Sequence, residues 1–310
     1  MDTSVLFHAG ELAVQNAAGE ADRAARVGEM IDPVVPLGVQ NFLRERTFAV
    51  LATVDTAGQP TASIVYGRPG FLSADGGDEL AVDWQNTLLD PLDPVNHRAA
   101  VGSQIGMIAM KLNARLRYRV NGRVTANDDQ RLTIAVEEAF GNCTKYIQAR
   151  ALTSIAIGNE SEAELTTGDG RLSEAAAALA TSADTFFIAS HGPHGRADIS
   201  HRGGQPGFVR IEPNGDVLVA DYRGNSLFNT LGNLSVEPLA GLLFPDFGSG
   251  WTLQVAGRVS LDFDQPDPHN YSGGTGRFWR LTPSGWRRWR SIARPTWELI
   301  ELSPANPIPT

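Results

Sequence analysis

The stretch Thr47–Phe71, TFAVLATVDTAGQPTASIVYGRPGF, aligns without a gap onto Asp184–Phe208, DTFFIASHGPHGRADISHRGGQPGF, 137 positions later. Seven of the 25 aligned positions hold identical residues, where ordinary composition would give about one or two. Four of these identities fall together at the end, where Gly67-Arg-Pro-Gly-Phe71 meets Gly204-Gln-Pro-Gly-Phe208. A repeat this long indicates two copies of one domain rather than a solenoid of short units.

The correspondence continues beyond this stretch with small changes of offset. Leu80–Trp84 matches Leu218–Tyr222, and Arg119–Val124 matches Gln254–Val259. Both pairs are short and rich in apolar and β-branched residues, which is typical of strands. The duplication therefore extends over most of a barrel-sized domain.

Local patterns within the copies predict strands joined by tight turns, with a few helices. Thr47–Asp55 and Gln59–Tyr66 flank a turn that ends at Gly58, which predicts a β-hairpin. Apolar residues at helical spacing predict a helix over Asp128–Gly141, and a second helix is expected from about Ser226. Short strands with turns in both copies favour an antiparallel barrel elaborated by helices.

The repeat divides the 310-residue chain, which is long enough for two domains of roughly 150 residues each. We predict a helical segment over residues 1–46 and a first barrel repeat over 47–150. A linker with a helix follows over 151–183, and a second barrel repeat over 184–310.

Composition narrows the classes of function. The net charge of −9 argues against nucleic acid and membrane surfaces as partners, since both need a basic face. A single cysteine, Cys143, excludes an intrachain disulfide and fits a cytoplasmic protein. No signal peptide or transmembrane segment is expected. His191, His194 and His201 lack carboxylate or cysteine neighbours at metal-ligand spacing, so no metal site is predicted.

The second copy carries the strongest local feature, in Asp198–Phe208 and Asp221–Asn233. Arg202 stands beside two glycines, which let a ligand approach the backbone. Gly224-Asn-Ser226 is expected to open a helix, whose free N–H groups favour a phosphate. The pattern indicates an anion site, although a tight loop with a solvated Arg202 gives the same spacing.

These residues resemble the pyridoxamine 5′-phosphate oxidase-like flavoproteins, in particular the predicted flavin-nucleotide-binding subgroup. The resemblance implies two tandem split β-barrels with peripheral helices, a mainly β fold of the α+β class, and bound FMN. It also implies that Arg202 and the Gly224-Asn225 turn meet the FMN phosphate. The matching pieces are Ser200–Val209, Asp221–Asn225, Phe228–Leu234, Gly241–Phe244 and Leu253–Val259. The implied cofactor-binding residues are Ser200, Arg202, Gly203, Gln205, Asp221, Gly224, Asn225 and Asn229.

The first copy is similar to the same family but departs from it at the phosphate site. Val65 stands where Arg202 stands in the second copy, and Gln85–Asp90 replaces the Gly-Asn turn. A phosphate beside Val65 would lack a compensating charge. We therefore expect one FMN per chain, in an intrachain pseudo-dimer whose first copy forms the far wall of the pocket. A homodimer of such chains is also possible.

Arginines are the candidates for that far wall. On a strand, Arg115, Arg117 and Arg119 would share one face. They would then hold an anionic substrate or stabilise reduced flavin, unless this face is simply solvated. Arg68, in the loop after the first hairpin, is a comparable candidate.

The resemblance implies an FMN-dependent oxidoreductase that acts on a small molecule with a reductant such as NADPH. A non-catalytic flavin carrier or sensor, and a haem-binding or haem-degrading protein, are the alternatives. No catalytic side chain is identified, and whether the protein is an enzyme stays open at this point.

Overall fold

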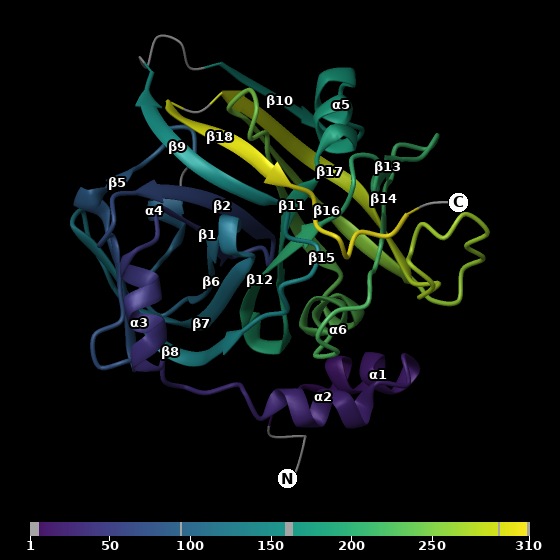
Figure 1. Ribbon diagram of the computed structural model, residues 1–310, viewed down its shortest axis with the longest axis horizontal. Coiled ribbons are helices and arrows are strands. Elements are labelled where there is room, and N and C mark those ends of the chain that lie inside the picture. The colour runs from purple at the N-terminus through teal and green to yellow at the C-terminus, as the bar shows by residue number, and fades with distance from the viewer. Residues whose placement is uncertain (1–5, 94, 159–163, 291, 309–310) are drawn as a thin grey trace.

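The computed structural model describes residues 6–93, 95–158, 164–290 and 292–308. Within these ranges, two curled antiparallel sheets make up most of the chain, and a few short helices lie around them (Figure 1). The predicted fold class, mainly β with peripheral helices, is confirmed.

The first sheet has the strand order β3-β4-β8-β7-β6-β1-β2-β5. The predicted hairpin is present, with Phe48 opposite Tyr66 and Val54 opposite Pro60. The bounds are β1 Phe48–Val54, β2 Pro60–Gly67, β3 Leu72–Ser73, β4 Glu79–Asp83, β5 Thr87–Leu88, β6 Gln104–Lys111, β7 Leu116–Asn127 and β8 Arg131–Gly141.

Strand β8 corrects the sequence analysis, which predicted a helix over Asp128–Gly141. Leu132, Ile134 and Val136 are buried while the residues between them are partly exposed, which is the two-residue period of a strand. β8 pairs with β7 along its whole length and with β4. Pairing with two neighbouring strands therefore makes this segment a strand, although a few of its apolar residues have helical spacing.

The second sheet repeats this arrangement. Its order is β12-β11-β15-β16-β17-β14-β13, and β10 pairs with β17. Element by element, this matches β2-β1-β6-β7-β8-β4-β3 of the first sheet. The bounds are β10 Leu165–Asp169, β11 Thr185–His191, β12 Ala197–Gly203, β13 Val209–Ile211, β14 Val217–Ala220, β15 Leu239–Pro245, β16 Trp251–Asp262 and β17 Phe278–Arg290.

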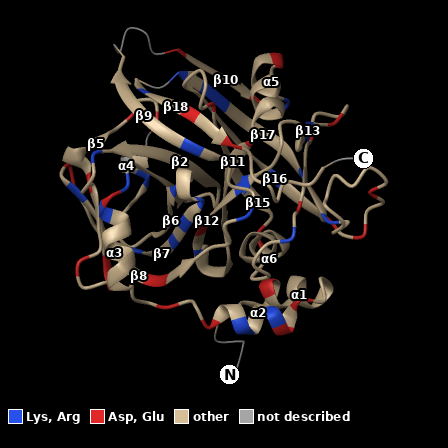
Figure 2. Cartoon of the chain, viewed as in Figure 1, with Lys and Arg blue, Asp and Glu red and all other residues tan. Residues whose placement is uncertain are grey.

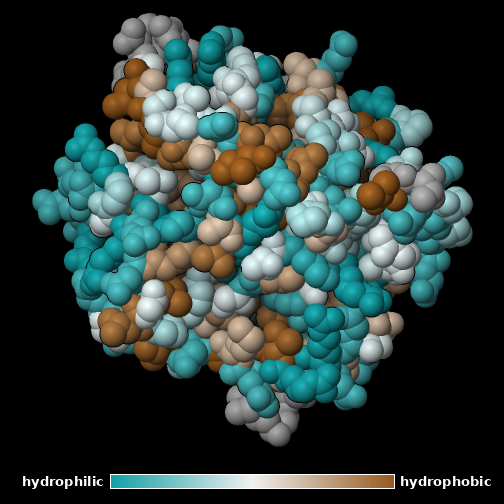
Figure 3. Space-filling view, viewed as in Figure 1, coloured by the Kyte–Doolittle hydropathy of each residue, from teal (hydrophilic) through white to brown (hydrophobic). Residues whose placement is uncertain are grey.

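A third, two-stranded sheet joins the middle of the chain to its end. β9 (Ala149–Ile157) pairs with β18 (Ala293–Glu301). Ile157, Leu299 and Ile300 on these strands are about half exposed or more, and brown atoms gather over this region in Figure 3.

The helices lie at the ends and edges of the sheets. Helix α1 starts with a capping box. The His8 side chain accepts from backbone N–H groups of the first turn, and the Glu11 carboxylate accepts from the His8 backbone N–H. Ser173 caps α5. The bounds are α1 Ala9–Ala17, α2 Ala21–Gly28, α3 Leu37–Arg44, α4 Val95–Arg98, α5 Glu174–Ser182 and α6 Asn229–Val236, with 3-10 turns η2 Trp84–Asn86, η3 Leu112–Ala114 and η5 Pro193–Gly195.

Each half has its own buried apolar core, and a third core lies between the two halves. One apolar cluster fills the first sheet and another fills the second. A third cluster lies between them and combines Phe48, Val50 and Ile108 with Phe187 and Leu243. The faces of β1, β2 and β6 therefore pack on β11, β12 and β15, so the two barrels form one body.

Charged residues of both signs are interspersed over both halves (Figure 2). No helix among the described residues has the length and apolarity needed to cross a bilayer.

Candidate functional site

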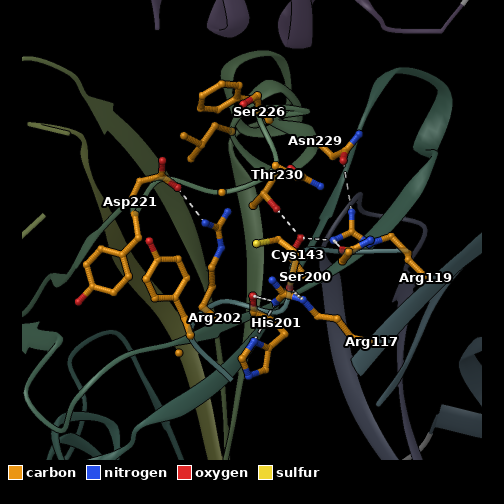
Figure 4. Close-up of a pocket in the computed structure, with 18 of the residues that line it drawn as sticks. Arg117, Arg119, Cys143, Ser200, His201, Arg202, Asp221, Ser226, Asn229 and Thr230 are labelled. Carbon is orange, nitrogen blue, oxygen red and sulfur yellow. Dashed lines mark hydrogen bonds and ion pairs between the residues drawn. The ribbon is translucent and has the colours of Figure 1, made fainter. Parts of the chain in front are cut away.

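A pocket opens between the two halves, close to the amino end of α6 (Figure 4). We call it the arginine pocket. Strand β7 and the segment after β8 supply one wall, and β12, the segment after β14 and the start of α6 supply the other. Its lining includes Arg117, Arg119, Asn142, Cys143, Tyr146, Ser200, His201, Arg202, Gly203, Asp221, Tyr222, Gly224, Asn225, Ser226, Phe228, Asn229 and Thr230.

Arg119 ties the two halves together at the back of this pocket. Its guanidinium donates to Asp198 and to the Ser200 hydroxyl, each at 2.7 Å, and to Asn142 at 3.0 Å. Only 4% of Arg119 is exposed. The charge of Arg119 is therefore matched by Asp198, and its role is to fix Ser200.

Arg202 extends from β12 toward Asp221, as Figure 4 shows. Its Nη1 donates to Asp221 at 2.8 Å, and Arg277 donates to the other oxygen of the same carboxylate at 3.0 Å. The Nε of Arg202 is buried without a hydrogen-bond partner among the described residues. Two guanidinium groups thus share Asp221, and Arg277 also pairs with Glu20 at 3.8 Å.

Arg117 has no carboxylate within ion-pair distance among the residues that the structure describes. It donates to the carbonyl oxygens of Cys143 at 2.8 Å and His201 at 3.2 Å, and its Nη1 lies 3.0 Å from His201 Nδ1. Burial and the nearby charges of Arg119 and Arg202 lower the pKa of Arg117 to about 9. Burial, and then the charges of Arg117, Arg202 and Arg150, hold the pKa of His201 well below its usual range, so His201 is neutral. A bound anion would relieve this uncompensated charge.

The amino end of helix α6 lies in the same pocket as the arginines. The helix begins at Asn229, not near Ser226 as predicted, and no side chain caps it. Asn229, Thr230 and Leu231 line the pocket. First-turn N–H groups of a helix have no intrahelical partner and carry the positive end of its dipole. The segment Gly224–Phe228 is an irregular connection, so it does not itself form the helix opening.

The backbone around the pocket is strained. Tyr146 (φ 65°), Ser226 (φ 71°) and Phe228 (φ 57°) all take the left-handed conformation and all line the pocket. Such conformations cost about 1–3 kcal/mol each outside glycine and concentrate at ligand-binding sites.

The dimensions of the pocket suit the charged end of a ligand. Its enclosed volume is about 100 Å³, whereas pockets that enclose whole small molecules span about 300–1,000 Å³. At its mouth the rings of Tyr146 and Tyr222 lie 4.9 Å apart, centroid to centroid. The donors fit a phosphate, and the tyrosines offer aromatic faces to a planar group.

The N-terminal helices hold the segment that ends at α6. Gln15 donates to the Leu227 carbonyl at 3.0 Å, and Asn229 donates to the Glu11 carboxyl at 2.6 Å. The Ser226 hydroxyl bonds to Glu20. Sequence reasoning missed this role, because nothing in residues 1–46 indicates that they return to a loop more than 200 residues away.

Glu11 is a buried carboxyl beside the arginine pocket. Desolvation raises its pKa to about 7, against hydrogen bonds from His8 and Asn229 that lower it, and Glu138 and Asp198 raise it further. Only 6% of Glu11 is exposed. The group therefore changes charge near neutral pH next to the start of α6.

Most predicted site residues lie together, and three do not. Gln205 is exposed in the turn before Phe208, and Arg68 is exposed in the equivalent turn of the first copy. Arg115 lies outside the pocket, where it bonds to Glu301 and the Ile147 carbonyl. The predicted residues that line the pocket are Arg117, Arg119, Ser200, Arg202, Gly203, Asp221, Gly224, Asn225 and Asn229.

The equivalent position in the first copy is closed. Val65, the counterpart of Arg202, is 2% exposed and belongs to the first barrel's core. Asp93 accepts from Ser63, the counterpart of Ser200, at 2.7 Å. Gln254, the counterpart of Arg119, donates to the Ala62 carbonyl and to Asp93. The chain itself thus occupies this position, and Val65 provides no charge where Arg202 provides one in the second copy.

Comparison with known proteins finds likeness in structure only. The sequence matches no known family, and no curated protein matches it. Among solved structures, HupZ of Group A Streptococcus is 14% identical over 34% of this chain and 94% of its own, with a TM-score of 0.27. HutZ, the haem storage protein of Vibrio cholerae, is 15% identical over 37% and 91%, with a TM-score of 0.27.

A candidate pyridoxamine 5′-phosphate oxidase of Lactobacillus delbrueckii is 18% identical over 35% of this chain and 95% of its own, with a TM-score of 0.27. The two sheets with one strand order indicate duplication of one unit within this chain.

Proposed function

We propose that the chain binds FMN in the arginine pocket, with the phosphate between Arg202, Arg117 and the amino end of α6. The observation that carries this proposal is the convergence of guanidinium and helix N–H donors there. Arg117 lacks a carboxylate partner among the described residues, Arg202 shares one with Arg277, and α6 is uncapped. Phosphates bind where free N–H groups and guanidinium donors converge in this way.

The isoalloxazine would lie toward the pocket mouth, beside Tyr146 and Tyr222. Bound FMN would supply the redox chemistry, and the protein would supply orientation and electrostatics. Arg117, on β7 of the first half, would offset the negative charge that reduced flavin carries. We propose an oxidoreductase that takes electrons from a reductant such as NADPH and acts on a small molecule. The alternative is a carrier that holds the flavin without turnover.

A haem protein is the other alternative, and the geometry favours flavin over it. His201 is the histidine that lines the pocket, and its Nε2 is buried without a partner while its Nδ1 faces Arg117. This ring is not open to an axial position. Guanidinium groups and helix N–H groups suit a phosphate better than they suit an iron centre.

Absorption spectroscopy of the purified protein, before and after addition of FMN, tests the proposal. Bands in the flavin region that stay with the protein through gel filtration are expected. A Soret band would point to haem, and protein that ignores added FMN would contradict the proposal. Bleaching of the bound flavin by NADPH, followed by repeated turnover, separates an enzyme from a carrier.

A further inference from the structure

A second hollow, of about 570 Å³, lies between the halves and shares no lining residue with the arginine pocket. We call it the second hollow. Its volume falls within the range of about 300–1,000 Å³ that is usual for small-molecule sites. Residues Gln59–Ala62 at the start of β2 form one side, and the sheet of β15, β16, β17 and β10 forms the floor.

Strand register places two rows of residues across this floor. One row consists of small residues and ends at an aspartate. In it, Gly241 lies opposite Ala256, Ala256 opposite Gly285, and Gly285 opposite Asp169. The next row on the same face is polar, with Gln254 opposite Arg287 and Arg287 opposite Thr167. Rows two residues apart along a strand are separated by about 7 Å.

The internal repeat shows why this space is open. Its counterpart is the crevice formed by Asn121, Glu138 and Arg196–Asp198, which His8 and Glu11 of the N-terminal segment help to fill. In the second hollow, Ala256 and Gly285 stand in the places of Asn121 and Glu138. No helix equivalent to α1 enters it among the described residues. The space thus comes from both smaller side chains and a missing helix.

Two arginines meet at the polar row. Arg287 comes from β17 and Arg98 from α4, and neither forms an ion pair with a carboxylate among the described residues. Within the described part of the chain, Arg98 Nη1 and Arg287 Nε are buried without hydrogen-bond partners. The carboxyl group close to both is Asp93, which already accepts bonds from Ser63 and Gln254. An incoming carboxylate would complete this pair of guanidinium groups.

We propose that the second hollow binds a small organic carboxylate, held by Arg287 and Arg98. The apolar body of the ligand crosses Ala256 and Gly285, where a Cβ on Gly285 would meet nothing closer than 3.8 Å, whereas Gly241 is covered by the Pro60 backbone of β2. Asp169, at the end of the small-residue row, accepts from an amino group at the ligand's far end. The site is separate from the proposed flavin site and does not depend on it.

Titration calorimetry with 6-aminohexanoate, hexanoate and hexylamine tests this proposal, because the three probes share a body and differ in their ends. We expect 6-aminohexanoate to bind most tightly and hexanoate more weakly. Hexylamine should bind at least about tenfold more weakly than 6-aminohexanoate, since it lacks the charge-assisted bonds to arginine. No binding of either carboxylate, or equal binding of hexylamine, would overturn the proposal.

Variants of the two arginines test whether the carboxylate binds in the second hollow. Arg287→Gln and, separately, Arg98→Gln should each weaken 6-aminohexanoate by at least about tenfold. Arg288→Gln is the matched control, because the next residue on β17 faces the other way and lies over the Trp251 ring. Arg202→Ala should leave this binding unchanged while it weakens FMN. Circular dichroism melting confirms that each variant is folded, and equal binding by the Arg287 and Arg98 variants would refute the site.

Discussion

At the scale of single residues, the three arginines of the pocket differ in what neutralises them. Arg119 is matched by Asp198, Arg202 shares Asp221 with Arg277, and Arg117 contacts carbonyl oxygens and a neutral histidine. Arg119 is therefore a structural link between the halves. Among the described residues, Arg117 has no carboxylate partner, and Arg202 keeps a buried Nε without a hydrogen-bond partner, so both have donors to offer to a ligand.

Arg202→Ala should weaken FMN binding by about ten- to a hundredfold, because the phosphate loses a charge-assisted donor. Fluorescence quenching of FMN on titration with protein measures the effect. Arg68→Ala is the matched control, because the repeat places Arg68 in the equivalent loop of the first copy and its side chain is exposed. Equal losses in both variants would contradict the assignment of the phosphate to the second copy.

Glu11 should make stability depend on pH near neutrality. Its pKa is about 7 in the fold, above the usual value of 4.5, mainly because the carboxyl is buried. The stabilising effect of the proton it holds is complete below about pH 4.5 and is lost as the pH rises to about 7. This effect is on the order of 3 kcal/mol.

Glu11→Gln should therefore flatten the fall in melting temperature between pH 5 and pH 8, measured by calorimetry. Glu29→Gln, at an exposed position after α2, is the control and should keep the slope of the unmodified protein. If Glu11→Gln keeps that slope as well, the carboxyl is already ionised at pH 5.

Errors at single residues have local causes. Arg115 was expected to share a face with Arg117 and Arg119, but it ends the η3 turn at φ 52°, one residue before β7. The alternation of a strand does not extend to a residue outside it. Gln205 lies in a turn whose backbone closes on Phe208, so its side chain points to solvent.

At the scale of elements, α1 packs on α6 through two glycines. A Cβ on Gly10 would lie 2.3 Å from the Gly232 carbonyl oxygen, and one on Gly232 would lie 2.5 Å from Glu11 Cγ. This close approach brings Glu11 to Asn229 and Gln15 to Leu227. The N-terminal helices therefore act on the proposed ligand site through its loop.

Gly232→Ala should push α1 away from α6 and cost about 1–3 kcal/mol, as overpacking does. Faster amide hydrogen exchange over residues 224–231 and a loss of FMN affinity should accompany it. Gly38→Ala, where an added Cβ meets nothing within 4 Å, is the control and should change neither. Unchanged exchange in Gly232→Ala would show that α1 does not order the loop.

The sequence predicted some elements well and others poorly, for physical reasons. The hairpins β1–β2 and β11–β12 were predictable because their apolar runs flank glycine-containing turns. β8 was not, because Leu132, Val136, Ala139 and Phe140 also fit a helical period, and only its partners β7 and β4 decide between the two. The role of α1 depends on contacts between distant segments, which no local pattern encodes.

At the scale of the whole molecule, duplication has produced two unequal halves. The sheets share one strand order and pack through a common core. The arginine pocket lies on one side of this pairing, with a wall from each half. At the equivalent position, Val65 is buried and Asp93 reaches Ser63 and Gln254, so that side is closed by the chain itself.

This asymmetry predicts one FMN per chain, measured by absorbance of the flavin released from a weighed amount of protein. Dimerisation of the chain would not change that ratio, because both walls of the pocket come from one chain. Val65→Arg should not create a second site, since a guanidinium in the first barrel's core would lack a partner and lower the stability instead. Two flavins per chain, or a second flavin in Val65→Arg, would mean that the segment around Asp93 gives way to a ligand and that the halves are functionally equivalent.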